Sequence, residues 1–163
     1  MYQSIREFVE DWTRESATSL KVEQALTDAS LSQNSDPDGR TLGRLGWHMV
    51  LMIGGMGSAA GLTVAAPPRG TEAPKTAAAI AQAYETAALS MAQEAAKLED
   101  GQLGEELTAF GRPMTRAGLL QALVRHQIHH RGQMSILMRS AGLVVPSIYG
   151  PTREGSAPPP PHR

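Results

Sequence analysis

The segment of this 163-residue chain with the clearest chemical potential is RHQIHHRGQ, which contains His126, His129 and His130. His126 and His130 are four residues apart, so in a helix their side chains lie one turn apart on the same face. Two imidazoles in this arrangement can bind one metal ion without bending the helix. Two imidazoles inside a core are costly unless something satisfies them, so the spacing indicates either a metal site or a hydrogen-bonded pair.

A third histidine, His48, lies on the inward stripe of another expected helix, at alternating steps of three and four from Leu45 and Met52. A bundle brings inward-facing residues of different helices to one level. Three neutral imidazoles would leave coordination positions open, as a catalytic metal requires. We therefore expect the Nε2 atoms of His48, His126 and His130 to converge to within roughly 3–4 Å, with His129 to the side. The second ring nitrogen of each ligand should find a hydrogen-bond acceptor.

The same histidine pair fits the zinc-protease motif HExxH, but Gln127 stands where that motif has its glutamate. An amide cannot act as a general base, which argues against a protease of this kind.

Four amphipathic helices must position these residues, and breaker-rich segments separate them. The third helix, for example, has an inward stripe of Ala77, Ile80, Tyr84, Ala87, Met91, Ala95 and Leu98. We expect an all-α four-helix bundle over residues 1–154, with no sheet beyond a stray short pairing. The proline-rich tail 155–163 is expected to be disordered. The four helices should cover about 5–28, about 41–62, from Thr71 or Thr76 to about 98, and about 115–141.

A run of glycines follows His48 in the second helix, and it indicates close packing, room for a ligand, or a frayed helix end. The stretch from Leu45 to Ala66 carries no formally charged side chain, yet a buried helix explains it better than a membrane span, because it contains His48 and five glycines. We therefore expect no membrane partner.

Composition excludes several functions. There are no cysteines, so a disulfide framework, a thiolate zinc site and a cysteine nucleophile are ruled out. The 15 basic and 16 acidic residues are nearly balanced, and nothing indicates a nucleic-acid partner. The N-terminus does not resemble a signal peptide, and we expect a cytoplasmic protein.

The residues that follow the histidines resemble those of a known family. The block LLQALVRHQIHHRGQMSILMRSAGLVVPSIYGP is similar to the C-terminal signature of the DinB/YfiT-like metalloenzymes. REFVEDWTRESATSLKVEQALTDASLSQ resembles the first helix of that family, and RTLGRLGWHMVLM resembles its second. The resemblance covers the chain from Met1 to about Glu154. It departs after IYGPTRE, where the chain continues directly into a proline run.

The resemblance implies an up-down-down-up four-helix bundle, often a homodimer. It also implies a divalent metal ion (zinc, nickel or iron) bound by His48, His126 and His130. Relatives include S-transferases and an isomerase that use a low-molecular-weight thiol.

We expect a metal-dependent enzyme with a small-molecule substrate, either a thiol S-transferase or a hydrolase. Three neutral ligands leave the ion its full charge, which lowers the pKa of bound water or thiol. His129, Gln133 and Tyr149 are candidates to assist. Two other hypotheses remain open: a metal-binding or stress-response protein without turnover, and a structural dimerisation bundle.

Overall fold

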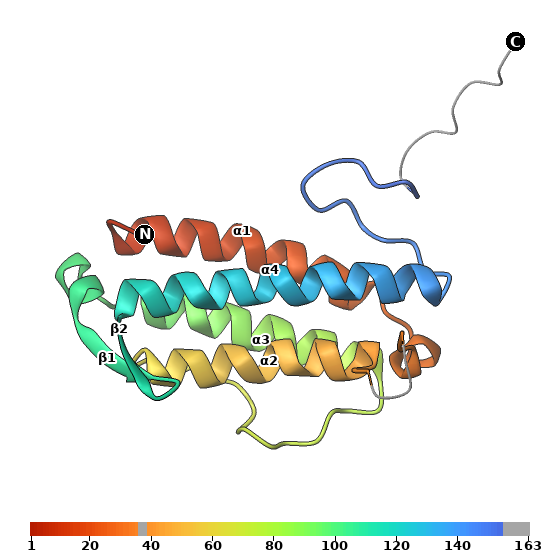
Figure 1. Ribbon diagram of the computed structural model, residues 1–163, viewed down its shortest axis with the longest axis horizontal. Helices are drawn as coiled ribbons and strands as arrows, with labels where there is room; N and C mark the ends of the chain where they lie inside the picture. Colours follow the sequence, from red (N-terminus) through yellow and green to blue (C-terminus); the bar gives the residue numbers. More distant parts are fainter. Residues whose placement is uncertain (36–38, 155–163) are drawn as a thin grey trace, which may run out of the picture.

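The computed structural model describes residues 1–35 and 39–154, so the expected disorder of the tail 155–163 lies outside the described residues. Four helices form a bundle (Figure 1): α1 (Ile5–Gln24), α2 (Leu42–Ala59), α3 (Ala77–Ala95) and α4 (Arg116–Ser140). Helices α1 and α4 run in one direction and α2 and α3 in the other, which is the expected up-down-down-up connectivity. Each of α1 and α2 packs against both α3 and α4. Because α2 and α3 are parallel, the connection between them must run back along the bundle, as it does in Figure 1.

Each helix begins where a hydroxyl side chain precedes it. Ser4, Thr41, Thr76 and Thr115 are the N-caps, and each side-chain oxygen accepts a hydrogen bond from the backbone N–H three residues later. Such caps satisfy donors that the helix itself leaves unpaired. Of the two threonines considered for α3, Thr76 is the cap.

Three helices end a few residues earlier in the chain than the sequence predicted. Helix α1 stops at Gln24, and Thr27 then caps a separate 3₁₀ helix, η1 (Asp28–Ser32). Asp28, the first residue of η1, connects to another helix: its carboxylate accepts a hydrogen bond from the backbone N–H of Ala77, the first residue of α3, at 2.8 Å. Helix α2 ends at Ala59, just before Gly61 adopts a positive φ of 80°, and α3 ends at Ala95.

A short antiparallel hairpin precedes α4. Strand β1 (Glu106–Ala109) pairs with β2 (Arg112–Thr115), and a second 3₁₀ helix, η2 (Asp100–Gly104), comes before them. Phe110 and Gly111 form the turn, with φ of 54° and 73°. The left-handed region costs a non-glycine residue roughly 1–2 kcal/mol, so Phe110 is strained. The all-α expectation, which allowed one stray short pairing, is confirmed.

The core follows the expected stripes. Every residue of the third predicted stripe that lies on α3 is buried, and Leu98, just beyond the end of α3, is partly buried. Trp12 is fully buried, and its indole N–H donates to the Ala88 carbonyl at 2.9 Å. No helix in the described ranges is long and apolar enough to cross a membrane.

The glycine run of α2 is explained mainly by close packing. A Cβ on Gly54 would lie 2.7 Å from the Cβ of Ala66, and one on Gly57 would lie 2.5 Å from a methyl group of Val64. Both neighbours belong to the connection that returns from α2 to α3. Gly55, in contrast, has no neighbour within 4 Å.

Candidate metal centre

Helix α4 supplies two of the three histidines. Leu123 and Met134 are fully buried on its inward face, one turn before His126 and one turn after His130. This packing fixes the rotation of the helix, so that both imidazoles point to the same side. His130 is buried and His126 is half-buried.

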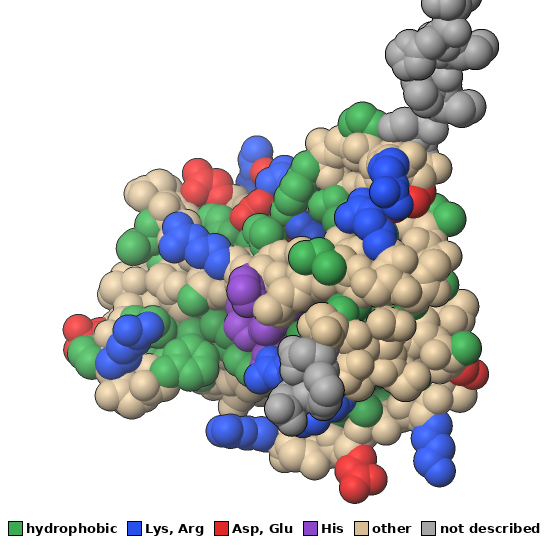
Figure 2. Space-filling view, turned by 45° about the vertical axis from the view of Figure 1, so that its right-hand side comes forward, with side chains coloured by type: hydrophobic (Ala, Val, Ile, Leu, Met, Phe, Trp, Pro, Cys, Tyr) green, Lys and Arg blue, Asp and Glu red, His purple; other side chains and the backbone are tan. Residues whose placement is uncertain are grey.

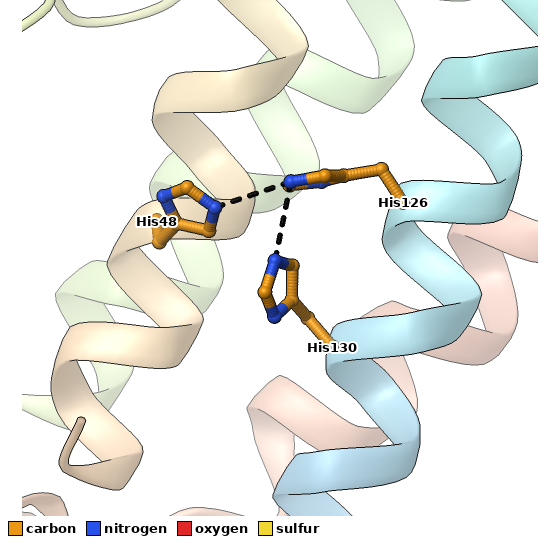
Figure 3. Close-up of side chains that lie close together, drawn as sticks. All are labelled: His48, His126 and His130. Carbon is orange, nitrogen blue, oxygen red and sulfur yellow. Dashed lines mark hydrogen bonds between the residues drawn. The ribbon is translucent and has the colours of Figure 1, made fainter. Parts of the chain in front are cut away.

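Helix α2 supplies the third imidazole. Helix α2 packs against α4 and runs in the opposite direction (Figure 1), and His48 on α2 faces His126 and His130 on α4 (Figure 3). The Nε2 atoms of His48 and His126 are 3.2 Å apart, and those of His126 and His130 are 3.1 Å apart. Figure 3 shows the three rings converging from the two helices.

In the described part of the chain, these three side chains form a group whose donor atoms are close enough together to bind one metal ion. One nitrogen from each ring lies within 4.8 Å of the other two. The rings of His48 and His130 are nearly perpendicular, at 88°, and those of His126 and His130 are inclined at 73°. The rings therefore meet with nitrogen atoms facing inward and are not stacked.

The environment keeps these imidazoles neutral. Burial is the largest cause that lowers the pKa of His48 and of His126 to about 4, and the neighbouring histidines add to it. Burial likewise lowers the pKa of His130. A neutral imidazole has a lone pair available for a metal ion, so the donor set is already in the protonation state that coordination requires.

Gln133 orients one ring. Its side-chain oxygen lies 2.6 Å from Nδ1 of His130. With that oxygen as acceptor, the proton sits on Nδ1 and the lone pair of Nε2 faces the other two histidines. The three inward nitrogens would then share at most a proton or two between them, whereas one cation would satisfy all three.

The expectation of an acceptor for every second ring nitrogen is wrong for His126. Its Nδ1 is buried and has no hydrogen-bond partner among the residues described. Its neighbour in the chain, Gln127, makes its hydrogen bonds to other residues. Gln127 is fully buried, accepts from the Tyr84 hydroxyl at 3.1 Å and donates to the Met49 carbonyl at 3.2 Å.

The residues considered as assistants lie in different places. Gln133 contacts His130 directly, and His129 is exposed with its ring centroid 4.9 Å from that of His130. The Tyr149 hydroxyl donates to Glu15 at 2.6 Å and also contacts Arg131. No hydrogen bond in the described ranges joins Tyr149 to the three histidines.

Sequence reasoning missed the buried polar cluster around Arg131. This guanidinium is 1% exposed as a side chain and pairs with the Glu15 carboxylate at 2.7 Å. It also donates to the Ser19 hydroxyl at 3.0 Å. The cluster ties α1 to α4 and to the segment after α4, because Tyr149 joins it. An arginine directly after the histidine pair was the available signal.

Comparisons with known proteins agree with this architecture. The model of the DinB family matches residues 1–162. The Bacillus subtilis (strain 168) protein YrdA is 41% identical over 156 residues, which cover 94% of this chain and 93% of YrdA. A crystal structure of a DinB-like protein from Bacillus cereus has a TM-score of 0.87 at 39% identity, and the match covers 91% of this chain and 100% of that one.

A DinB-like crystal structure from Bacillus subtilis, YjoA, has a TM-score of 0.71 at 21% identity, over 87% of this chain and 96% of that one, and supports the fold alone. Fold and site thus define an all-α bundle whose inward-facing histidines could bind a metal ion between two helices. The chain belongs to the DinB family.

Proposed function

We propose that this protein is a metal-dependent enzyme of the thiol S-transferase or hydrolase class, with a divalent ion held by His48, His126 and His130. The observation that carries the proposal is the convergence of three Nε2 atoms, 3.2 and 3.1 Å apart along the two closest pairs. Ligand atoms about 2.0–2.1 Å from one zinc-like ion would be separated by similar distances.

The chemistry of the donor set supports catalysis more than a structural role. Structural zinc sites usually have four protein ligands, whereas this group has three. A bound divalent ion would lower the pKa of a coordinating water or thiol toward neutrality. Cavities border the histidines, so a small molecule has room beside them.

The protein's own side chains would prepare the site in two ways. Gln133 would hold the proton of His130 on Nδ1, which keeps Nε2 directed inward. His129 is exposed beside His130 and lines the same cavity, so its imidazole could form a hydrogen bond with a substrate bound there. Because the chain has no cysteine, a thiol nucleophile would come from a small-molecule thiol.

The first test is elemental analysis of protein purified without a histidine tag, which would also distinguish zinc, nickel and iron. We expect about one ion per chain in the unaltered protein and less than a tenth of that in His126→Ala and His130→Ala, with the helical circular dichroism unchanged. His129→Ala is the matched control on the same helix and should keep its metal. Full metal content in both ligand variants would contradict the proposed site.

The second test is turnover. The metal-loaded protein would be assayed with bacillithiol, mycothiol or glutathione against 1-chloro-2,4-dinitrobenzene, and with p-nitrophenyl acetate for hydrolysis. Activity that is lost in His126→Ala and kept in His129→Ala supports the enzyme. Stoichiometric metal without turnover in either assay would instead favour a sensor or scavenger.

A further inference from the structure

Three adjoining cavities around the histidines share one side chain, that of Arg40. A cavity of about 510 Å³ is lined by Arg40, His129, His130 and Gln133. A second, of about 500 Å³, is lined by Arg40 together with His48, His126 and His130. A third, of about 420 Å³, lies between Arg40 and His48 on the side of Trp47. These volumes are those of small-molecule sites.

Arg40 brings a positive charge to these cavities, and no carboxylate of the described residues 1–35 and 39–154 pairs with it. It is exposed and forms no ion pair with any residue that the structure describes. Its charge contributes to lowering the pKa of all three histidines, which places the guanidinium within electrostatic reach of each. Glu72 lines the third cavity, but it too is outside ion-pair distance. Among the described residues that line these cavities, three neutral ligands together with a divalent ion and Arg40 would give a surplus of positive charge.

An apolar wall faces the same space. Phe110, at the tip of the β1–β2 hairpin, lines the 500 Å³ cavity together with Met52, Met56 and Ala122. The Phe110 residue is 63% exposed and its φ is 54°, a conformation that favours glycine. Because the Phe110 ring is largely exposed, it contributes little to the stability of the core. Core packing therefore does not explain an aromatic residue at this strained turn. Strain of this kind often occurs at ligand sites.

Figure 2 shows this arrangement from outside. The histidine side chains reach the surface between an area of hydrophobic side chains and basic side chains. A ligand lying over the histidines would thus touch an apolar surface on one side and a cation on the other.

We propose that the site selects a small substrate with two parts, an anionic group that pairs with Arg40 and an apolar body that packs against Phe110, Met52 and Met56. The inference rests on the proposed function, because the reacting group of the substrate would lie at the histidines between these two contacts. Charge-assisted pairing with a guanidinium suits a carboxylate or phosphate, and the exposed ring suits an aryl or alkyl group.

The test uses three thiols that differ in one part each. The complete probe, 2-mercapto-3-phenylpropanoate, has a carboxylate and a ring. Phenylethanethiol lacks the carboxylate, and 2-mercaptopropanoate lacks the ring. Binding to cobalt-loaded protein would be followed by visible absorption, and binding to metal-free protein by titration calorimetry, so that recognition is measured with and without the ion.

We expect loss of the carboxylate to weaken binding at least about tenfold, which is a usual effect for a hydrogen bond to a charged group. Arg40→Gln should remove this preference and leave the preference for the ring, whereas Phe110→Ala should do the reverse. Arg69→Gln and Leu89→Ala alter an exposed arginine and an exposed leucine that line none of the three cavities, and they should change neither preference.

The outcomes separate the two proposals. If no cobalt binds, the proposed metal function fails, and the calorimetric arm still decides the role of Arg40 and Phe110. If cobalt binds but Arg40→Gln and Phe110→Ala leave both preferences unchanged, the inference about the substrate is overturned while the metal site stands.

Discussion

Glu23 on α1 offers a direct test of how burial controls stability in this bundle. The residue is 1% exposed, and neither carboxylate oxygen has a hydrogen-bond partner among the described residues. One oxygen lies 2.5 Å from where a Cβ on Gly46 would be, so the side chain is enclosed by α2. Burial raises the pKa of Glu23 from 4.5 to about 8.

The sign of the effect follows from this upward shift. Below the pKa that Glu23 has in the unfolded chain, the carboxyl group is protonated in both the folded and the unfolded state. Its ionisation then makes no contribution to the free energy of unfolding. As the pH rises from 4.5 to about 8, the unfolded chain ionises while the folded chain must keep its proton, so stability falls. At about 1.4 kcal/mol per pKa unit, the cost is roughly 1 kcal/mol at pH 5, roughly 3 kcal/mol at pH 7 and roughly 4 kcal/mol at pH 8.

Glu23→Gln should remove this cost. The amide is neutral at every pH and has nearly the shape of the protonated acid, so the variant should match the parent near pH 4.5 and exceed its stability increasingly above it. Urea denaturation at pH 5, 6, 7 and 8 under identical metal conditions measures the difference. Glu106→Gln, which changes an exposed carboxylate on β1, is the control and should give a difference near zero throughout. A difference that is independent of pH, or a variant less stable at pH 8, would show that Glu23 is ionised and solvated in the folded protein.

Four further predictions concern metal binding, a buried ion pair, two glycines and the oligomeric state. Zinc binding, measured by equilibrium dialysis, should be nearly constant from pH 8 to pH 5 and fall toward pH 4. Burial lowers the pKa of His126 to about 4, and protonation of this ring competes with the metal ion. A loss of zinc already complete at pH 6 would contradict this prediction. Glu15→Ala should destabilise the fold by about 3–5 kcal/mol in urea denaturation, because it leaves the Arg131 guanidinium buried without its carboxylate; a cost below about 1 kcal/mol would refute the pairing. Gly57→Ala should lower the free energy of unfolding by about 1–3 kcal/mol, because the added methyl group overpacks the contact with Val64. Gly55→Ala has open space and should raise the free energy of unfolding by up to about 1 kcal/mol. Equal shifts in melting temperature for the two variants would show that the packing argument fails. We expect a C₂ homodimer, and a monomer mass by light scattering at micromolar concentration would decide against it.

The sequence by itself determined the helices and the face that each presents. Periodicity identified four helices because an amphipathic stripe is a local property, and the α3 stripe from Ala77 to Ala95 is buried as expected. Capping is also local, so Thr71 and Thr76 were the two candidates for the start of the third helix, and Thr76 is the cap. Thr41 and Thr115 cap the helices that were expected to begin near them. The spacing of His126 and His130 alone placed both rings on one face.

Only the tertiary structure decided which distant residues contact the helix termini and what encloses the side chains. Asp28 and Asp100 cap the first residues of α3 and α1 from 49 and 95 positions away in the chain, and no local pattern signals such bonds. The antiparallel packing of α2 on α4 brings Nε2 of His48 to 3.2 Å from that of His126. The sequence periodicity predicted that both side chains face inward, but it could not determine the distance between them. The surroundings of the site include Arg40 and Phe110, which line one cavity with the histidines and belong to a loop and a hairpin turn. Such segments carry no periodicity, and their positions follow from how the helices they connect are packed.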